Sequence, residues 1–119
     1  MNEKWVELGQ LDQSDCDFSK YNKDIGIFKA IYNNEIVYIG KAIEVNNGGF
    51  RKRLSDFTRE SDSGRNSEVA KLLYENKKDI SIKLYILNDK TASEIEVIKE
   101  DLLIKYKPKW SEPDFLKWE

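Results

Sequence analysis

Glu100 carries a charge at a position where most of its neighbours are apolar. Val97 lies three residues before it, and Leu103 and Ile104 lie three and four residues after it, so they border it on a helix surface. Glu96 has no such neighbours. A carboxylate among apolar groups is unfavourable unless a cation or hydrogen-bond donors compensate it. Glu100 is therefore a better candidate for a metal ligand than Glu96, although structural pairing with a lysine is the commoner role of such a residue.

Arg53 is the candidate cation for binding a phosphate. It has Phe50 three residues before it and Phe57 four residues after it, which places it beside the apolar stripe of a helix. A guanidinium stays charged and can hold two phosphate oxygens at once. The alternative is structural, because the stem of an arginine often covers apolar surface.

The chain contains no histidine and a single cysteine, Cys16. A Cys/His zinc site, a Ser-His-Asp triad and an internal disulfide are therefore excluded. No stretch approaches the roughly 20 apolar residues that span a bilayer. We expect a soluble, cytoplasmic protein of one domain, since 119 residues suit a single core.

The net charge of −2 is distributed unevenly. Residues 1–25 contain six acidic and three basic side chains, whereas residues 41–65 contain six basic and four acidic ones. This distribution can present a basic face despite an acidic total, or it can be a solvated surface. The candidate phosphate-contacting residues are Lys41, Arg51, Lys52, Arg53 and Arg59.

Three segments have the pattern of β-strands. Residues 26–32 and 35–40 are rich in β-branched and aromatic side chains, and Asn33 and Asn34 between them tolerate the positive φ of a tight hairpin turn. Residues 80–86 alternate apolar and polar side chains, which predicts a strand with one buried face.

Three further segments have the pattern of helices. One begins near Phe50, and a second, shorter one includes residues 69–73. The last begins after Thr91, which forms a capping box with Glu94, and ends near Tyr106, before a proline.

The predicted fold is of the α+β class: a three-stranded antiparallel sheet flanked by helices, in the order strand-strand-helix-helix-strand-helix. Residues 1–25 are predicted to be an irregular lead-in packed on the domain, residues 26–111 the domain, and residues 112–119 a tail.

The order of these parts resembles the GIY-YIG nuclease family. The motif positions are Gly26, Ile27 and Phe28 in the first strand, Tyr38, Ile39, Gly40 and Lys41 in the second, an arginine in the next helix and a glutamate shortly before a proline. The resemblance covers about residues 26–111 and agrees with the predicted fold.

The resemblance implies a metal-dependent endonuclease that hydrolyses DNA, with RNA not excluded, and Mg²⁺ or Mn²⁺ as cofactor. It makes Glu100 the metal ligand and Arg53 the cation at the transition state, and it places Tyr38 and Lys41 near the attacking water. We expect these four side chains to line one concave surface.

The chain departs from the family pattern at three positions. Phe28 stands where tyrosine is usual, Phe57 where many relatives have histidine or tyrosine, and Ser111 where the family has asparagine. A phenyl ring cannot transfer a proton, so a nucleic-acid-binding module with weakened or absent catalysis is the main alternative. A protein-interaction domain that uses the acidic N-terminal segment is a third.

Overall fold

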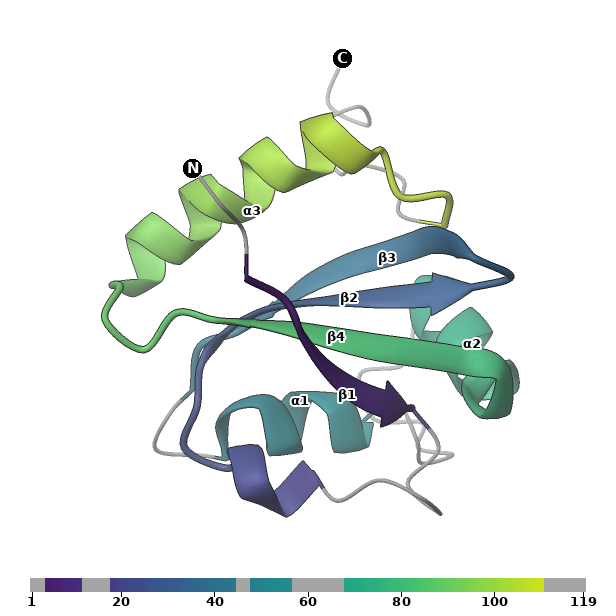
Figure 1. Ribbon diagram of the computed structural model, residues 1–119, viewed down its shortest axis with the longest axis horizontal. Coiled ribbons are helices and arrows are strands. Elements are labelled where there is room, and N and C mark those ends of the chain that lie inside the picture. The colour runs from purple at the N-terminus through teal and green to yellow at the C-terminus, as the bar shows by residue number, and fades with distance from the viewer. Residues whose placement is uncertain (1–3, 12–17, 45–47, 57–67, 111–119) are drawn as a thin grey trace.

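A four-stranded antiparallel sheet lies at the centre of the computed structural model, which describes residues 4–11, 18–44, 48–56 and 68–110. The strands are β1 (Val6–Gln10), β2 (Gly26–Tyr32), β3 (Glu35–Ala42) and β4 (Ile80–Ile86). Their order across the sheet is β1-β4-β2-β3 (Figure 1). β3 is therefore at one edge of the sheet and, among the described strands, pairs with β2 alone.

The predicted hairpin is confirmed. Asn33 and Asn34 have φ values of 53° and 65°, and the turn they form joins β2 to β3. Asparagine tolerates this left-handed backbone better than most residues. The strand predicted at residues 80–86 is also confirmed, and β4 pairs with β2 along its whole length.

The prediction of three strands and an irregular lead-in is wrong at β1, which pairs with β4 and adds a fourth strand. The pairing register shifts between Glu7 and Gly9, and Gly9 has a φ of 124°. A bulge of this kind breaks the period-2 pattern by which a strand is found in a sequence. The predicted domain boundaries remain predictions.

The helices follow the predicted order. They are α1 (Gly49–Asp56), α2 (Glu68–Glu75) and α3 (Ala92–Tyr106), with short 3₁₀ turns η2 (Phe18–Tyr21) and η4 (Lys77–Asp79). The capping box of α3 is present, because Thr91 accepts a hydrogen bond from the backbone N–H of Glu94 and the Glu94 carboxylate accepts one from Thr91. In the part of the chain that the structure describes, no helix is long and apolar enough to span a membrane.

The sheet separates two apolar cores (Figure 1). On the α1 side, Phe50 and Leu54 pack against Phe28 and Ala30 of β2. On the α3 side, the buried residues are Ile27, Ile39, Leu87, Ile95 and Leu102. Alternating residues of β2 therefore belong to different cores, as the pleat of a strand requires.

Candidate functional site

The two motif aromatics of the hairpin are in contact on the α1 side. The rings of Phe28 and Tyr38 have centroids 5.8 Å apart, and Phe28 is only 1% exposed. Gly40 lies opposite Phe28 in the β2–β3 register. A Cβ atom on Gly40 would lie 2.6 Å from Cζ of Phe28 and 2.8 Å from Cε2 of Tyr38. Glycine is thus required for these two rings to pack.

The other hairpin motif positions also have packing roles. Gly26 has a φ of 151°, and a Cβ atom there would lie 2.0 Å from the carbonyl oxygen of Tyr85. A side chain at this position would therefore separate β2 from β4. Ile27 and Ile39 are fully buried in the α3-side core. These three positions need no catalytic explanation.

Arg53 lies on α1 with its side chain 42% exposed. Its Nη2 atom lies 4.0 Å from Oε1 of Glu44, just beyond the end of β3, and both side chains are well exposed. Such a long, solvated ion pair contributes little to stability. The guanidinium is therefore only weakly held and accessible to an anion.

Lys41 of β3 forms an ion pair and hydrogen bond with Glu96 of α3. The hydrogen bond donated by Lys41 lowers the pKa of Glu96, and the charge of Lys99 lowers it further. Sequence reasoning had dismissed Glu96. Its position four residues before Glu100, on the same flank of a helix, is the only sequence signal that relates it to the site.

Glu100 is exposed on α3, and it forms no ion pair with any residue that the structure describes. Val97 and Ile104 beside it are 58% and 65% exposed. Two of its three apolar neighbours therefore face solvent, whereas Leu103 is half-buried against the α3-side core. Glu100 is nevertheless an uncompensated carboxylate that can accept a ligand.

The candidate residues lie on two sides of the sheet. Tyr38 packs against the α1-side core, which also contains residues of the helix that carries Arg53. Lys41 contacts α3, the helix that carries Glu100. The expectation that the four candidate side chains line one concave surface is therefore not met. β3, at the edge of the sheet, is the element that both groups share.

The remaining predicted residues lie on α1 or outside the described residues. Arg51 and Lys52 are exposed on α1. Phe57, Arg59 and Ser111 lie outside the described residues. Lys109 and Trp110 donate backbone hydrogen bonds to the carbonyls of Ile36 and Val37, so the chain after α3 returns to the first half of β3.

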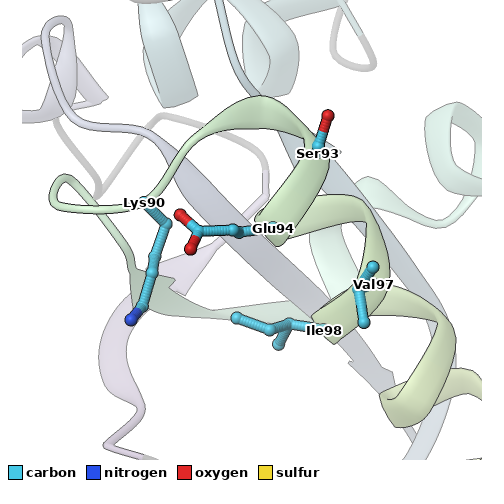
Figure 2. Close-up of a pocket in the computed structure, with 5 residues that line it drawn as sticks. All are labelled: Lys90, Ser93, Glu94, Val97 and Ile98. Carbon is cyan, nitrogen blue, oxygen red and sulfur yellow. The ribbon is translucent and has the colours of Figure 1, made fainter.

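A pocket of about 380 Å³ lies elsewhere, beside the first turns of α3 (Figure 2). It is lined by Lys90, Ser93, Glu94, Val97 and Ile98, none of which is a candidate site residue. Within the described ranges, no group of three or more Asp, Glu, Cys or His side chains is arranged to hold a metal ion. Any protein ligation of a metal at the described residues would come from one or two carboxylates.

The fold is similar to that of the N-terminal endonuclease domain of UvrC from Thermotoga maritima. A tyrosine-to-phenylalanine mutant of that domain, bound to the catalytic divalent cation, superposes with a TM-score of 0.54 at 18% identity, over 79% of this chain and 89% of that one. The chain has the GIY-YIG fold.

Two further structures of the same domain agree. An asparagine-to-alanine mutant gives a TM-score of 0.52, and the form bound to magnesium gives 0.51, each at 18% identity and over 79% of this chain. They cover 93% and 94% of those chains. No sequence model of a protein family and no curated protein matches the chain. The GIY-YIG fold is therefore evident from the tertiary structure and the motif residues together.

Proposed function

We propose that the chain is a metal-dependent endonuclease that hydrolyses phosphodiester bonds in DNA. The observation that carries the proposal is the GIY-YIG fold, which the chain shares with an endonuclease domain bound to its catalytic divalent cation. Tyr38, Arg53 and Glu100 supply a hydroxyl, a guanidinium and a carboxylate on this fold.

Glu100 is the residue proposed to hold the metal. It is an exposed oxygen donor without an ion pair to any described residue, whereas Glu96 is already held by Lys41. A single carboxylate fits Mg²⁺ or Mn²⁺, since Mg²⁺ usually keeps several waters and binds substrate phosphate. When bound, the cation supplies Lewis-acid stabilisation of the charge that develops on the phosphate.

Arg53 is proposed to bind the phosphate during hydrolysis. A phosphodiester is anionic and gains charge when it is attacked, and a guanidinium beside it lowers the barrier electrostatically. The weak pairing of Arg53 with Glu44 leaves its donors available. The exposed Arg51 and Lys52 of α1, together with Arg59, are proposed to contact neighbouring phosphates.

We place the scissile phosphate along the edge of β3, because this strand separates the two groups of candidate residues. Tyr38 and Arg53 would approach it from the α1 side, and Lys41 and Glu100 from the α3 side. Tyr38 is proposed to orient the attacking water and to accept its proton as the phenolate, and the charged Lys41 ammonium, which cannot accept a proton, is proposed to donate hydrogen bonds beside it. Glu96 directs the Lys41 side chain toward α3.

A nucleic-acid-binding module with little or no catalysis is the second candidate. The observation in its favour is Phe28, whose ring is buried against Tyr38 and has no hydroxyl to exchange a proton. DNA is the proposed partner in both cases, RNA is an alternative substrate, and a cytoplasmic location remains a prediction.

The deciding experiment is incubation of the protein with supercoiled plasmid and with branched DNA, in Mg²⁺, in Mn²⁺ and in EDTA. We expect strand cleavage that requires the cation. Binding without cleavage in either metal would favour the second candidate, and neither binding nor cleavage of DNA or RNA would overturn both.

A further inference from the structure

Three segments that are distant in the sequence meet at one end of the sheet. We define this junction as Asp24, Ile25, Gly49, Phe50 and Asn88. The first two residues precede β2, the next two begin α1, and Asn88 lies in the turn between β4 and α3. Hydrogen bonds and one close backbone contact join the three segments.

The side chain of Asn88 binds both residues that precede β2. Its Oδ1 atom accepts a hydrogen bond from the backbone N–H of Ile25, and its Nδ2 donates one to Oδ1 of Asp24, each at 2.8 Å. The backbone N–H can only donate and the ionised carboxylate can only accept, so the residue between them must supply one acceptor and one donor. An asparagine amide does this with one planar group, whereas a carboxylate at position 88 would face Asp24 with a second negative charge.

Asp24 also contacts the first turn of α1. Its carbonyl oxygen accepts a hydrogen bond from the backbone N–H of Phe50 at 3.0 Å, and the first N–H groups of a helix have no partner within the helix. Gly49, with a φ of 49°, lies so close that a Cβ atom there would be 2.3 Å from the same oxygen. The start of α1 is therefore held directly on the backbone of Asp24.

The turn that contains Asn88 is tied to the sheet and leads into α3. The backbone N–H of Leu87 donates a hydrogen bond to the carbonyl of Ile25 at 2.8 Å, and Thr91 is the N-cap of α3. Figure 1 shows α1 and α3 on opposite sides of the sheet. A short path therefore connects the starts of these two helices through Asn88 and Asp24.

We propose that Asn88 and Asp24 are positioning residues, which set the place of α1, and with it Arg53, for the proposed reaction. Arg53 lies one helical turn after Gly49, so a shift of the first turn of α1 carries the guanidinium with it. Arg53 also lies beside Glu44, whose carbonyl accepts a hydrogen bond from the N–H of Gly49 at 3.0 Å. The inference rests on the proposed function in that Arg53 is the phosphate-binding cation. Misplacement of a reacting group by about 1 Å can lower a rate about 10²-fold.

The test exchanges the donor and the acceptor of the junction. Asn88→Asp removes the donor and places two carboxylates together, whereas Asp24→Asn keeps an acceptor at position 24. The double variant Asn88→Asp/Asp24→Asn restores the hydrogen bond with exchanged roles and keeps the wild-type net charge. The matched control is Asn76→Asp, since Nδ2 of Asn76 also donates one hydrogen bond, to the carbonyl of Leu72 on α2. If Asn88→Asp does not fold, Asn88→Ala, which removes both hydrogen bonds without adding charge, takes its place.

Amide hydrogen exchange, followed by NMR in EDTA without DNA, reports on α1 independently of cleavage. The Phe50 amide should exchange about tenfold faster in Asn88→Asp, because a hydrogen bond to a charged group is lost, and near the wild-type rate in the other three variants. Single-turnover plasmid cleavage in Mg²⁺ should slow about tenfold in Asn88→Asp and recover in the double variant. The affinity for DNA in EDTA should change by less than about twofold, because Arg53 is proposed to act as charge develops on the phosphate.

The outcomes separate this inference from the proposed function. If the wild type cuts no DNA, the nuclease is overturned, while Phe50 exchange that rises in Asn88→Asp and recovers in the double variant supports the junction, and unchanged exchange overturns it. Metal-dependent cleavage at the wild-type rate by Asn88→Asp would overturn the positioning role and leave the nuclease standing. Slower cleavage that does not recover in the double variant would also overturn that role, since the loss would then have a cause other than the hydrogen bond.

Discussion

The two sides of the central sheet differ in how their polar groups are arranged. On the α1 side, Phe28, Tyr38 and Gly40 form a tight apolar cluster, and Arg53 lies beyond it in a solvated position. On the α3 side, charges occur directly on the strands, at Lys29, Lys41 and Lys83. The first arrangement fixes the shape of the hairpin through ring packing. The second places lysines on the face of the sheet that α3 covers, where one of them, Lys41, is paired with a carboxylate of that helix.

The largest effect is expected at Glu100 on the α3 side. Glu100→Ala should lower metal-dependent cleavage about a thousandfold or more, because it removes the one carboxylate assigned to the cation, whose Lewis-acid effect amounts to several kcal/mol. Plasmid nicking under single-turnover conditions would measure the loss.

The matched control for this variant is Asp101→Ala, which removes an exposed carboxylate from the neighbouring position and should retain most activity. Glu96→Ala is less suitable as a control because it also releases Lys41. Unchanged cleavage by Glu100→Ala would show that Glu100 of α3 is not the metal ligand.

The tight packing on the α1 side can be disrupted by a substitution at Gly40. Gly40→Ala should lower the free energy of unfolding by about 1–3 kcal/mol, the usual range for overpacking a core. The added methyl would be within 3 Å of both Phe28 and Tyr38. Urea denaturation would measure the change.

The double variant Gly40→Ala/Phe28→Leu tests the cause. Removing the phenyl ring opens space for the methyl group, so the two changes should be less destabilising together than the sum of the single variants. Strictly additive changes in the free energy of unfolding would show that the rings do not restrict the size of the side chain at position 40.

A smaller effect is expected from restoring the missing hydroxyl. Phe28→Tyr should change the cleavage rate by less than the roughly 10²-fold contribution of a positioned proton-transfer group, because Tyr38 still carries the hydroxyl assigned to proton transfer. Tyr38→Phe, in contrast, should slow the reaction by at least that factor. A silent wild type that becomes active through Phe28→Tyr would instead support the binding module.

The smallest effect concerns the ion pair between β3 and α3. The pKa of Glu96 in the folded protein is below its ordinary value of 4.5, so the pair stabilises the fold above that pH and its contribution is lost as pH falls through the lowered pKa. Both side chains are about one-third exposed, and we expect only about 0.2–1 kcal/mol.

A double-mutant cycle with Lys41→Met and Glu96→Gln would measure this coupling in urea. The coupling energy should be present at pH 7 and should be lost as pH falls below 4.5 and through the lowered pKa of Glu96. A coupling that persists at the lower pH would show that the carboxylate charge is not its source.

The local parts of the fold could be predicted because their causes are local. The asparagine turn, the alternation of residues 80–86 and the capping box at Thr91 each depend on residues within a few positions of one another. β1 was missed because a bulge at Gly9 disrupts its alternation, and its pairing partner lies more than 70 residues away in the sequence. Backbone pairing at a sheet edge requires little of the side chains.

The sequence by itself determined the order of the elements, the exclusion of histidine chemistry and the residue types available at the motif positions. Only the tertiary structure decided which charges meet. It paired Lys41 with Glu96 rather than Glu100, exposed Val97 and Ile104, and placed Lys29 against Lys83. Helical spacing defines which residues share a flank, but the rotation of a helix on its sheet is set by the packing of the whole core. The neighbours of a charged side chain therefore depend on tertiary packing that no local pattern contains.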